Sequence, residues 1–355
     1  MSDQLLILEA PEKGLRLVVC TTRRLAQDAA RRHQLADGSA AVLGQALTGA
    51  LLLAVTDRAE PDVAEQARVD IQLDVEGPLK GLLVDADGNG SVRGLVRVNG
   101  LDRDGKRAHE LDGEAKSAQV FAHAGHVVGS GAIAGTGAGE LQFQPPQPLS
   151  RFDPRPLLGA ASDRRAGALS VLRAVQGEQG LHRAHVPFSG ADLGAGLSAF
   201  LRAERKLAGA IALEALFQPR EPLAAVAGAM LIPTEEDQRD TVSLMGDVLR
   251  DGEFLGALLE VEAATPGNAH ALAHRLAERM GLGELQTKGE MRPRFSCRCS
   301  RTRVVRALET LGPAELRDMA AKDGGAEATC DFCAEVYRIG AAELLALAEE
   351  PEKRQ

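Results

Sequence analysis

The chain has 355 residues, of which 45% are apolar and 26% charged, and its formal net charge is -9. This composition is ordinary for a soluble globular protein and excludes a disordered or fibrous one. The negative charge argues against nucleic acid or an anionic membrane as a partner of the whole surface, although it leaves room for a local basic patch. The length favours one large domain and at least one small module.

No targeting or membrane segment is expected from the sequence. The start, MSDQLLILEAPEKGLR, lacks the basic region and the small-residue cleavage site of a secretory signal. No stretch reaches the roughly 18 apolar residues of a membrane span. We therefore expect a cytoplasmic protein, in which thiols stay reduced and a cysteine cluster indicates a metal site or a redox device.

The first part of the chain predicts helices followed by an antiparallel meander. Two helices are expected at residues 24–33 and 40–55, and the second is apolar on nearly all faces, with Ser39 as its N-cap. Alternating apolar residues across 69–98 then predict three strands, with a turn from Asp87 to Gly90. This mixture predicts an α+β domain.

Residues 113–167 are rich in Gly, Ala and Pro and predict an irregular insertion, with short strands at 118–121 and 141–143. Order is expected to return after it. Residues 1–233 then form the N-terminal domain, which ends with strands at 169–175 and 181–188, a helix at 192–205, and strands at 209–216 and 224–232.

Two charged, amphipathic helices are predicted after Pro233. Thr234 is the expected N-cap of the first, because acidic residues follow it in the first turn. The second spans 268–280 and ends at Gly281. We interpret residues 234–290 as a helical linker between the main domain and a C-terminal module.

Four of the five cysteines lie in that module, as Cys297-x-Cys299 and Cys330-x-x-Cys333, with 30 residues between the pairs. Two short thiol pairs brought together by a fold supply the four soft ligands of a tetrahedral Zn²⁺ site. Cys20, in contrast, is predicted to be a small apolar residue of a buried strand.

The segment between the cysteine pairs predicts two helices. Ser300 can cap the first, which ends at Gly312, and Pro313 begins the second. Fewer than about 40 residues rarely fold by core burial alone, so the module, residues 291–340, is expected to depend on the metal. Residues 341–355 are expected to be a tail.

Six arginines surround the first cysteine pair, and they have more than one interpretation. They can stabilise thiolates, bind the phosphates of RNA or DNA in a zinc ribbon whose zinc is purely structural, or form a solvated face around a structural zinc. An oxidoreductase using Cys330 and Cys333 is disfavoured, because no thioredoxin-like βαβ pattern surrounds them. The arginines are Arg292, Arg294, Arg298, Arg301, Arg303 and Arg306.

Other motifs carry weaker signals. His270 and His274 have i,i+4 metal spacing but lack the Glu of a metalloprotease, so exposed helix histidines are the preferred interpretation. The DADGNG stretch begins like a calcium loop but has Val96 at position twelve. No Ser-His-Asp set or acidic pair has local support, so an enzyme is not expected.

The cysteine module resembles the zinc module of the redox-regulated heat-shock chaperones, the thirty-three-kilodalton chaperonin family. The resemblance lies in FSCRCSRTRVVRALETLG followed by CDFCAEVY. A hairpin of that family is similar to EGPLKGLLVDADGNGSVRGLVRV, with Gly77-Pro78 and Arg93-Gly94 as its elements. The end of the family's N-terminal domain and the start of its linker resemble GAMLIPTEEDQRD. The resemblance covers most of the chain except about 113–167. Thr302 departs from the family pattern, which usually has Glu there.

The resemblance implies a holdase chaperone that needs no ATP and is inactive while four thiolates hold Zn²⁺. Oxidation would then form disulfides between Cys297 and Cys299 and between Cys330 and Cys333, release zinc, and unfold the module and linker. It also implies dimerisation on activation and unfolded proteins as partners. The candidate client surface is a stripe on the linker, made by Val242, Met245, Val248, Leu249, Phe254 and Leu258.

Overall fold

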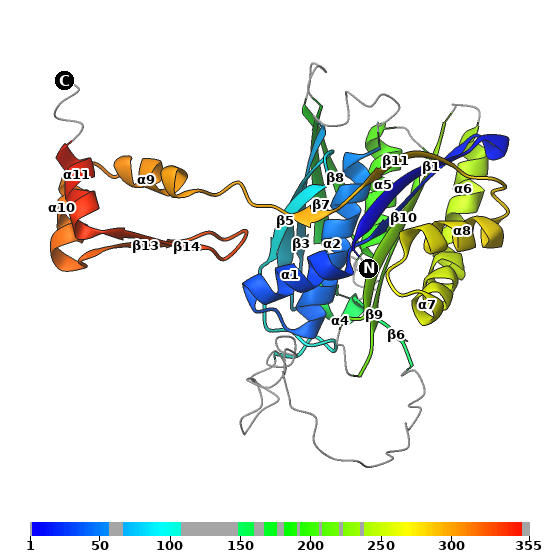
Figure 1. Cartoon of the computed structure of the whole chain (residues 1–355), viewed down its shortest axis with the longest axis horizontal. Coiled ribbons are helices and arrows are strands. Elements are labelled where there is room, and N and C mark those ends of the chain that lie inside the picture. The colour runs from blue at the N-terminus through cyan, green and yellow to red at the C-terminus, as the bar shows by residue number, and fades with distance from the viewer. Residues whose placement is uncertain are drawn as a thin grey trace, which may run out of the picture.

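Two six-stranded sheets form the main body of the protein (Figure 1). The structure, a computed structural model, describes residues 2–56, 67–107, 148–159, 167–175, 181–189, 192–205, 208–219, 223–234 and 238–349. In order across the first sheet, the strands are β11 (Gln286–Met291), β1 (Gln4–Ala10), β2 (Leu15–Thr21), β10 (Ala225–Pro233), β9 (Ala210–Phe217) and β6 (Ser150–Arg151).

The second sheet contains the predicted meander. Its neighbouring strands are antiparallel, apart from β12, which runs parallel to β5. The order is β12 (Arg294–Phe295), β5 (Ser91–Val96), β4 (Gly81–Asp87), β3 (Ala67–Val75), β7 (Gly167–Val175) and β8 (Leu181–Pro187). The predicted α+β class is therefore confirmed.

Helix α2 (Asp37–Ala54) lies between the two sheets and contacts strands of both. Every residue of α2 after Asp37 is buried, as expected for a helix that is apolar on all faces. Within the described residues, α2 is the one helix long and apolar enough to cross a membrane, and 94% of it is buried inside the protein. Helices α1 (Arg23–His33) and α5 (Leu193–Arg205) complete this central layer.

Three helices cover the outer face of the first sheet (Figure 1). The side chains of β2 alternate, so that Leu17 and Val19 pack under these helices while Val18 and Cys20 face α2. Because both faces are covered, every residue of β2 is buried. The helices are α6 (Arg239–Val248), α7 (Phe254–Ala264) after a π-helical segment at Leu249–Glu253, and α8 (Ala269–Met280).

The C-terminal module projects from one side of the main body (Figure 1). It has a small core of its own, made by Leu316, Ile339, Leu344 and Ala348. Its elements are α9 (Arg301–Glu309), α10 (Pro313–Lys322), the hairpin of β13 (Gly325–Thr329) and β14 (Val336–Gly340), and α11 (Ala341–Glu349).

The expectation of a tail from residue 341 is wrong for its described part. Helix α11 packs on α10, and Leu344 and Ala348 are both fully buried. In AAELLALAE the buried residues Leu344 and Ala348 are four positions apart, which places them on one face of a helix. This face fills a core that α10 and the hairpin leave open. Residues 350–355 lie outside the described residues.

Two predicted helix caps are also wrong. Helix α2 begins at Asp37, so Ser39 lies inside its first turn, where the Ser39 hydroxyl donates to the carbonyl of Val98 and accepts from the amide of Leu101. Helix α6 begins at Arg239, and the Thr234 amide instead donates to the carbonyl of Gly14. The Ser39 hydroxyl therefore has long-range partners in place of a local cap.

The predicted insertion contains part of the core at its C-terminal end. Strand β6 pairs with β9, and helix α4 (Arg155–Leu158) buries Leu157 and Leu158 completely. A Cβ atom on Gly77 would lie 2.4 Å from the carbonyl oxygen of Leu157, so the Gly-Pro element allows α4 to approach closely. The strands predicted at 118–121 and 141–143 lie outside the described residues.

Candidate metal centre

The four C-terminal thiols lie together at the tip of the β13–β14 hairpin. Cys297 and Cys299 come from the extended segment between β12 and α9, while Cys330 and Cys333 belong to the hairpin turn. That turn is closed by the amides of Cys333 and Ala334, which both donate to the carbonyl of Cys330. All four sulfur atoms lie within 4.8 Å of one another.

The sulfur distances suit a metal bound by four thiolates. Sγ of Cys297 is 3.7 Å from Sγ of Cys330, and Sγ of Cys299 is 3.3 Å from Sγ of Cys333. A tetrahedron with metal–sulfur bonds of about 2.3 Å has sulfur atoms about 3.8 Å apart. The donor set and its spacing therefore fit a single soft or borderline cation, and the cluster can hold a metal ion.

The pKa values of Cys297, Cys330 and Cys333 are shifted in different directions. Burial raises the pKa of Cys297, but hydrogen bonds from the Cys299 amide and the Arg93 guanidinium outweigh it and bring the pKa to about 7. Burial raises the pKa of Cys330 and Cys333, and hydrogen bonds with the neighbouring thiols raise that of Cys333 further. A bound cation relieves such crowding, because it favours the ionised form of the thiols.

A tyrosine and an arginine side chain also donate to sulfur atoms of the cluster. The Tyr337 hydroxyl donates to Sγ of Cys299 over 3.1 Å, and this bond together with burial raises the pKa of Tyr337. Nη1 of Arg93 donates to Sγ of Cys297 over 3.6 Å. Donors of this kind orient thiolate ligands around a metal and favour their ionised form.

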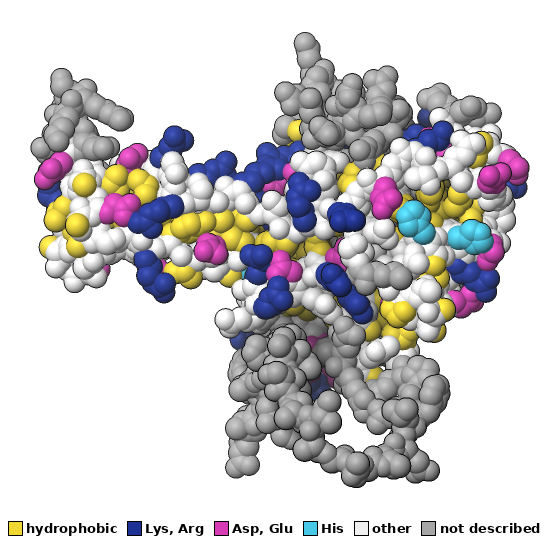
Figure 2. All heavy atoms as spheres, viewed as in Figure 1, with side chains coloured by type: hydrophobic (Ala, Val, Ile, Leu, Met, Phe, Trp, Pro, Cys, Tyr) yellow, Lys and Arg dark blue, Asp and Glu magenta, His cyan; other side chains and the backbone are white. Residues whose placement is uncertain are grey.

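Basic side chains gather where the module joins the main body (Figure 2). Of the six arginines noted in the sequence, Arg298 pairs with Asp87 over 3.5 Å, and Arg301 pairs with Glu343. Arg294 donates to the backbone and side chain of Asn89. These three therefore contribute to docking or to the module itself, while Arg303 and Arg306 are exposed on α9.

The predicted client stripe is mostly covered. Val242, Leu249, Phe254 and Leu258 are buried against the first sheet. Met245 is partly buried there, whereas Val248 is 40% exposed. The structure thus brings five of the six side chains into one apolar layer between α6–α7 and the first sheet.

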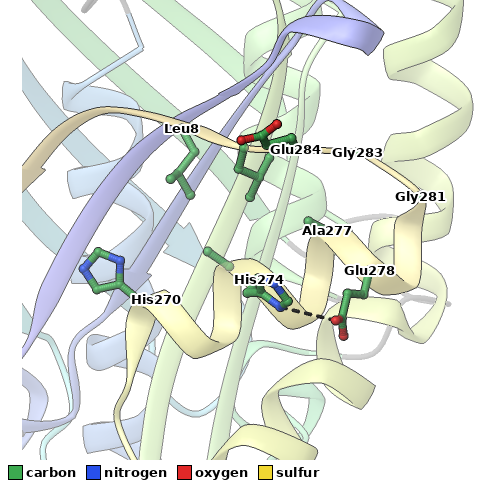
Figure 3. Close-up of a pocket in the computed structure, with 10 residues that line it drawn as sticks. Leu8, His270, His274, Ala277, Glu278, Gly281, Gly283 and Glu284 are labelled. Atoms are coloured by element: carbon green, nitrogen blue, oxygen red, sulfur yellow. Dashed lines mark ion pairs between the residues drawn. The ribbon is translucent and has the colours of Figure 1, made fainter.

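The helix histidines line a surface groove of about 540 Å³ between α8 and β1 (Figure 3). His274 faces Glu278 on its own helix, and His270 faces Glu290 on β11. They therefore do not converge on one ion, and the four cysteines are the group found in the described residues that can hold one. Cys20 is fully buried in β2, as predicted.

The residues around the thiols were less accessible from sequence than the thiols themselves. Spacing predicted that Cys297, Cys299, Cys330 and Cys333 meet, but it did not indicate that Arg93 contacts them across 204 positions of the chain. The signal that existed was the Arg-Gly element of the hairpin. The structure explains its glycine too, because a Cβ on Gly94 would lie 2.9 Å from a Val84 methyl group.

Comparisons with known proteins agree with this architecture. A family model described as Hsp33 protein matches residues 3–340. The 33 kDa chaperonin of Gloeobacter violaceus is 31% identical over 366 residues, which cover 99% of this chain and 96% of that protein. The 33 kDa chaperonin of Synechocystis sp. is 30% identical over 359 residues, covering 100% of this chain and 99% of that protein.

A solved structure has the same fold. The 33 kDa chaperonin of Thermotoga maritima superposes with a TM-score of 0.63 at 18% identity, covering 99% of this chain and 100% of that one. The family match over nearly the whole chain, the relatives and the shared fold agree with one another. The chain therefore belongs to the Hsp33 family of heat-shock chaperones.

Proposed function

We propose that the chain is a redox-regulated, ATP-independent holdase whose four cysteines bind one Zn²⁺ while they are reduced. The observation that carries the proposal is the convergence of four free thiols from two short motifs on one small module. Bound zinc would hold the two motifs together and keep their sulfurs ionised. In this state the apolar layer under α6 and α7 is covered and the protein is inactive.

Oxidation by peroxide during unfolding stress, or by hypochlorite, is the proposed activating step. With peroxide, a thiolate sulfur attacks one oxygen, the O–O bond breaks, and a sulfenic acid and hydroxide form. A neighbouring thiolate attacks the sulfenic sulfur, the S–S bond forms, and the S–O bond breaks to release a second hydroxide. Two electrons pass from each sulfur pair to one peroxide, and two protons convert both hydroxides to water.

We propose that the disulfides join Cys297 with Cys299 and Cys330 with Cys333. The sulfur contacts of 3.7 and 3.3 Å in the folded module instead link the two pairs, from Cys297 to Cys330 and from Cys299 to Cys333. Once the module unfolds, however, loop closure favours the partners that are nearest in sequence. Peptide mapping of the oxidised chain distinguishes these pairings.

Loss of the thiolates would remove the metal and destabilise the module, because its own core is small. The chain from Cys297 leads directly back through β12 and β11 to α8, so unfolding would reach the helices that cover the first sheet. The stripe from Val242 to Leu258 would then be available to unfolded proteins in the cytoplasm. A homodimer is the proposed form of the oxidised protein.

The test is light scattering from a heat-unfolding protein in the presence of this chain, reduced and zinc-loaded or oxidised, with released zinc measured in the same samples. We expect suppression only after oxidation, with about one zinc released per chain. Equal behaviour in both states would contradict the proposal. Salt-sensitive binding of nucleic acid that persists with zinc bound would favour the zinc-ribbon alternative.

A further inference from the structure

The reduced module meets the main body around a buried ion pair of the second sheet. Asp85, on β4, is 6% exposed, and its Oδ2 atom accepts hydrogen bonds from Nε and Nη2 of Arg93 over 3.1 and 2.8 Å. These two bonds fix the plane of the guanidinium on the outer face of the sheet. Nη1 remains free to point toward the module.

The guanidinium contacts both halves of the cysteine cluster. Nη1 of Arg93 donates to Sγ of Cys297, which belongs to the first pair. Its central carbon lies 4.2 Å from the centre of the Phe332 ring, which stands between the two cysteines of the second pair. A cation over an aromatic face and a charge-assisted bond to sulfur are both attractive, so one side chain joins the two pairs to the sheet.

Neighbouring contacts form the rest of the same interface. Nε2 of His33, at the end of α1, lies 3.1 Å from the carbonyl oxygen of Phe332. The Ser296 amide donates to the carbonyl of Val92, which continues the pairing of β12 with β5 up to the first cysteine. The Phe332 ring also lines a groove of about 360 Å³ on the outer face of β3, β4 and β7.

We propose that Arg93 is a positioning residue of the redox switch, which holds the reduced module against the second sheet and slows the loss of metal to oxidant. This inference rests on the proposed function and extends it to the main body. The contacts of Arg93 with Cys297 and Phe332 both need the closed thiol cluster, so docking and the integrity of that cluster depend on each other. The main body therefore sets how readily peroxide activates the chain.

The test uses the full-length, reduced, zinc-loaded chain and follows zinc release to a chromogenic chelator after addition of hydrogen peroxide. The variants Arg93→Leu and Phe332→Ala should each release zinc about tenfold faster than the unmodified chain. Arg93→Lys should be intermediate, because one ammonium cannot contact Asp85, Cys297 and the ring together. The matched control is Arg97→Leu, since Arg97 pairs with Asp74 on the same sheet.

The double variant Arg93→Leu/Phe332→Ala separates positioning from general destabilisation. If the two residues act through one contact, it should release zinc within about twofold of the faster single variant. Equal rates for Arg93→Leu and Arg97→Leu, or rate effects that multiply in the double variant, would overturn the inference. If Arg93→Leu lowers the melting temperature of the main body, the zinc-release rate of Phe332→Leu tests the positioning role instead, because this variant removes only the aromatic face.

The outcome for the unmodified chain keeps the two proposals apart. If it retains zinc under peroxide, the proposed function fails before Arg93 is at issue. If it releases zinc and suppresses aggregation while Arg93→Leu behaves as Arg97→Leu does, only the role of Arg93 is wrong.

Discussion

At the scale of single residues, the thiol cluster depends on groups that its spacing motifs do not contain. The Cys-x-Cys and Cys-x-x-Cys patterns were enough to predict that four sulfurs meet, because each short motif fixes two of them locally. The hydrogen bonds from Tyr337 and Arg93 could not be predicted. They depend on how the hairpin folds and on which face of the second sheet it meets.

Tyr337→Phe should weaken zinc binding about tenfold, because it removes the hydroxyl that donates to Sγ of Cys299. Competition with a chelator of known affinity measures the change. Val336→Ala is a suitable control on the same strand, since the Val336 side chain is exposed. An affinity equal to that of the unmodified chain would show that the hydroxyl bond does not support the metal.

A second residue-scale prediction concerns the ion pair of Arg151 with Glu214 on β9. Glu214 is 8% exposed, and burial raises its pKa although Arg151 partly offsets this. Arg151→Leu removes this offset and leaves a buried carboxylate without its partner. We expect the free energy of unfolding at pH 7 to fall by about 1–3 kcal/mol. This amount is smaller than for a fully buried pair, because the Arg151 side chain is 59% exposed.

The pH dependence of that variant has a definite sign. Because the folded pKa of Glu214 lies above its unfolded value, the favourable contribution of the protonated form is complete below the unfolded pKa and is lost as the pH rises through the folded one. Urea unfolding of Arg151→Leu should thus show falling stability from acidic to neutral pH, relative to the unmodified chain. Adding Glu214→Gln should abolish this slope, and a slope that persists would assign it to another group.

At the scale of elements, helices and strands with a long apolar periodicity were predicted from the sequence, whereas short strands with few apolar residues were missed. The helices at α1, α2, α8 and α10 and the meander were expected from their own residues. In contrast, β11 (QTKGEM) and β13 (GAEAT) have few apolar residues. They are strands because β11 pairs with β1 and β13 pairs with β14. The local sequence of a strand does not indicate such a partner.

Helix α11 supplies the element-scale prediction. Leu344→Ala should remove about 2–5 kcal/mol from a module whose core contains few other large side chains, so that the module unfolds at lower temperature. Fluorescence of Tyr337, the single tyrosine in a chain without tryptophan, reports this transition. Leu345→Ala is the matched control, because Leu345 is 44% exposed, and it should change little. Equal transitions would place α11 outside the cooperative module.

At the scale of the whole molecule, the thiol cluster and the covered apolar layer are connected by the chain between them. The helices α6 to α8 cover the first sheet, and β11 and β12 tie them to the module along the edges of both sheets. The sequence suggested a linker at 234–290. The sequence could not indicate that this segment covers a whole sheet face. That depends on alternate apolar side chains of β1, β2, β9 and β10, which point to the outer face of the first sheet.

Weakening this cover should activate the chain without oxidant. Leu258→Ala leaves a cavity between α7 and the first sheet, and we expect partial suppression of aggregation by the reduced, zinc-loaded variant. Leu244→Ala is the control, because Leu244 is 69% exposed on α6. An inactive Leu258→Ala variant whose helices have measurably loosened would argue against the stripe as the client surface.

Amide hydrogen exchange of the full chain, reduced with zinc and then oxidised, shows which helices unfold on activation. Oxidation should remove protection from α9–α11 and also from α6–α8, while α2 and the central strands keep theirs. Chaperone activity that arises while α6–α8 stay protected would contradict this expectation, because the apolar layer on the first sheet would still be covered.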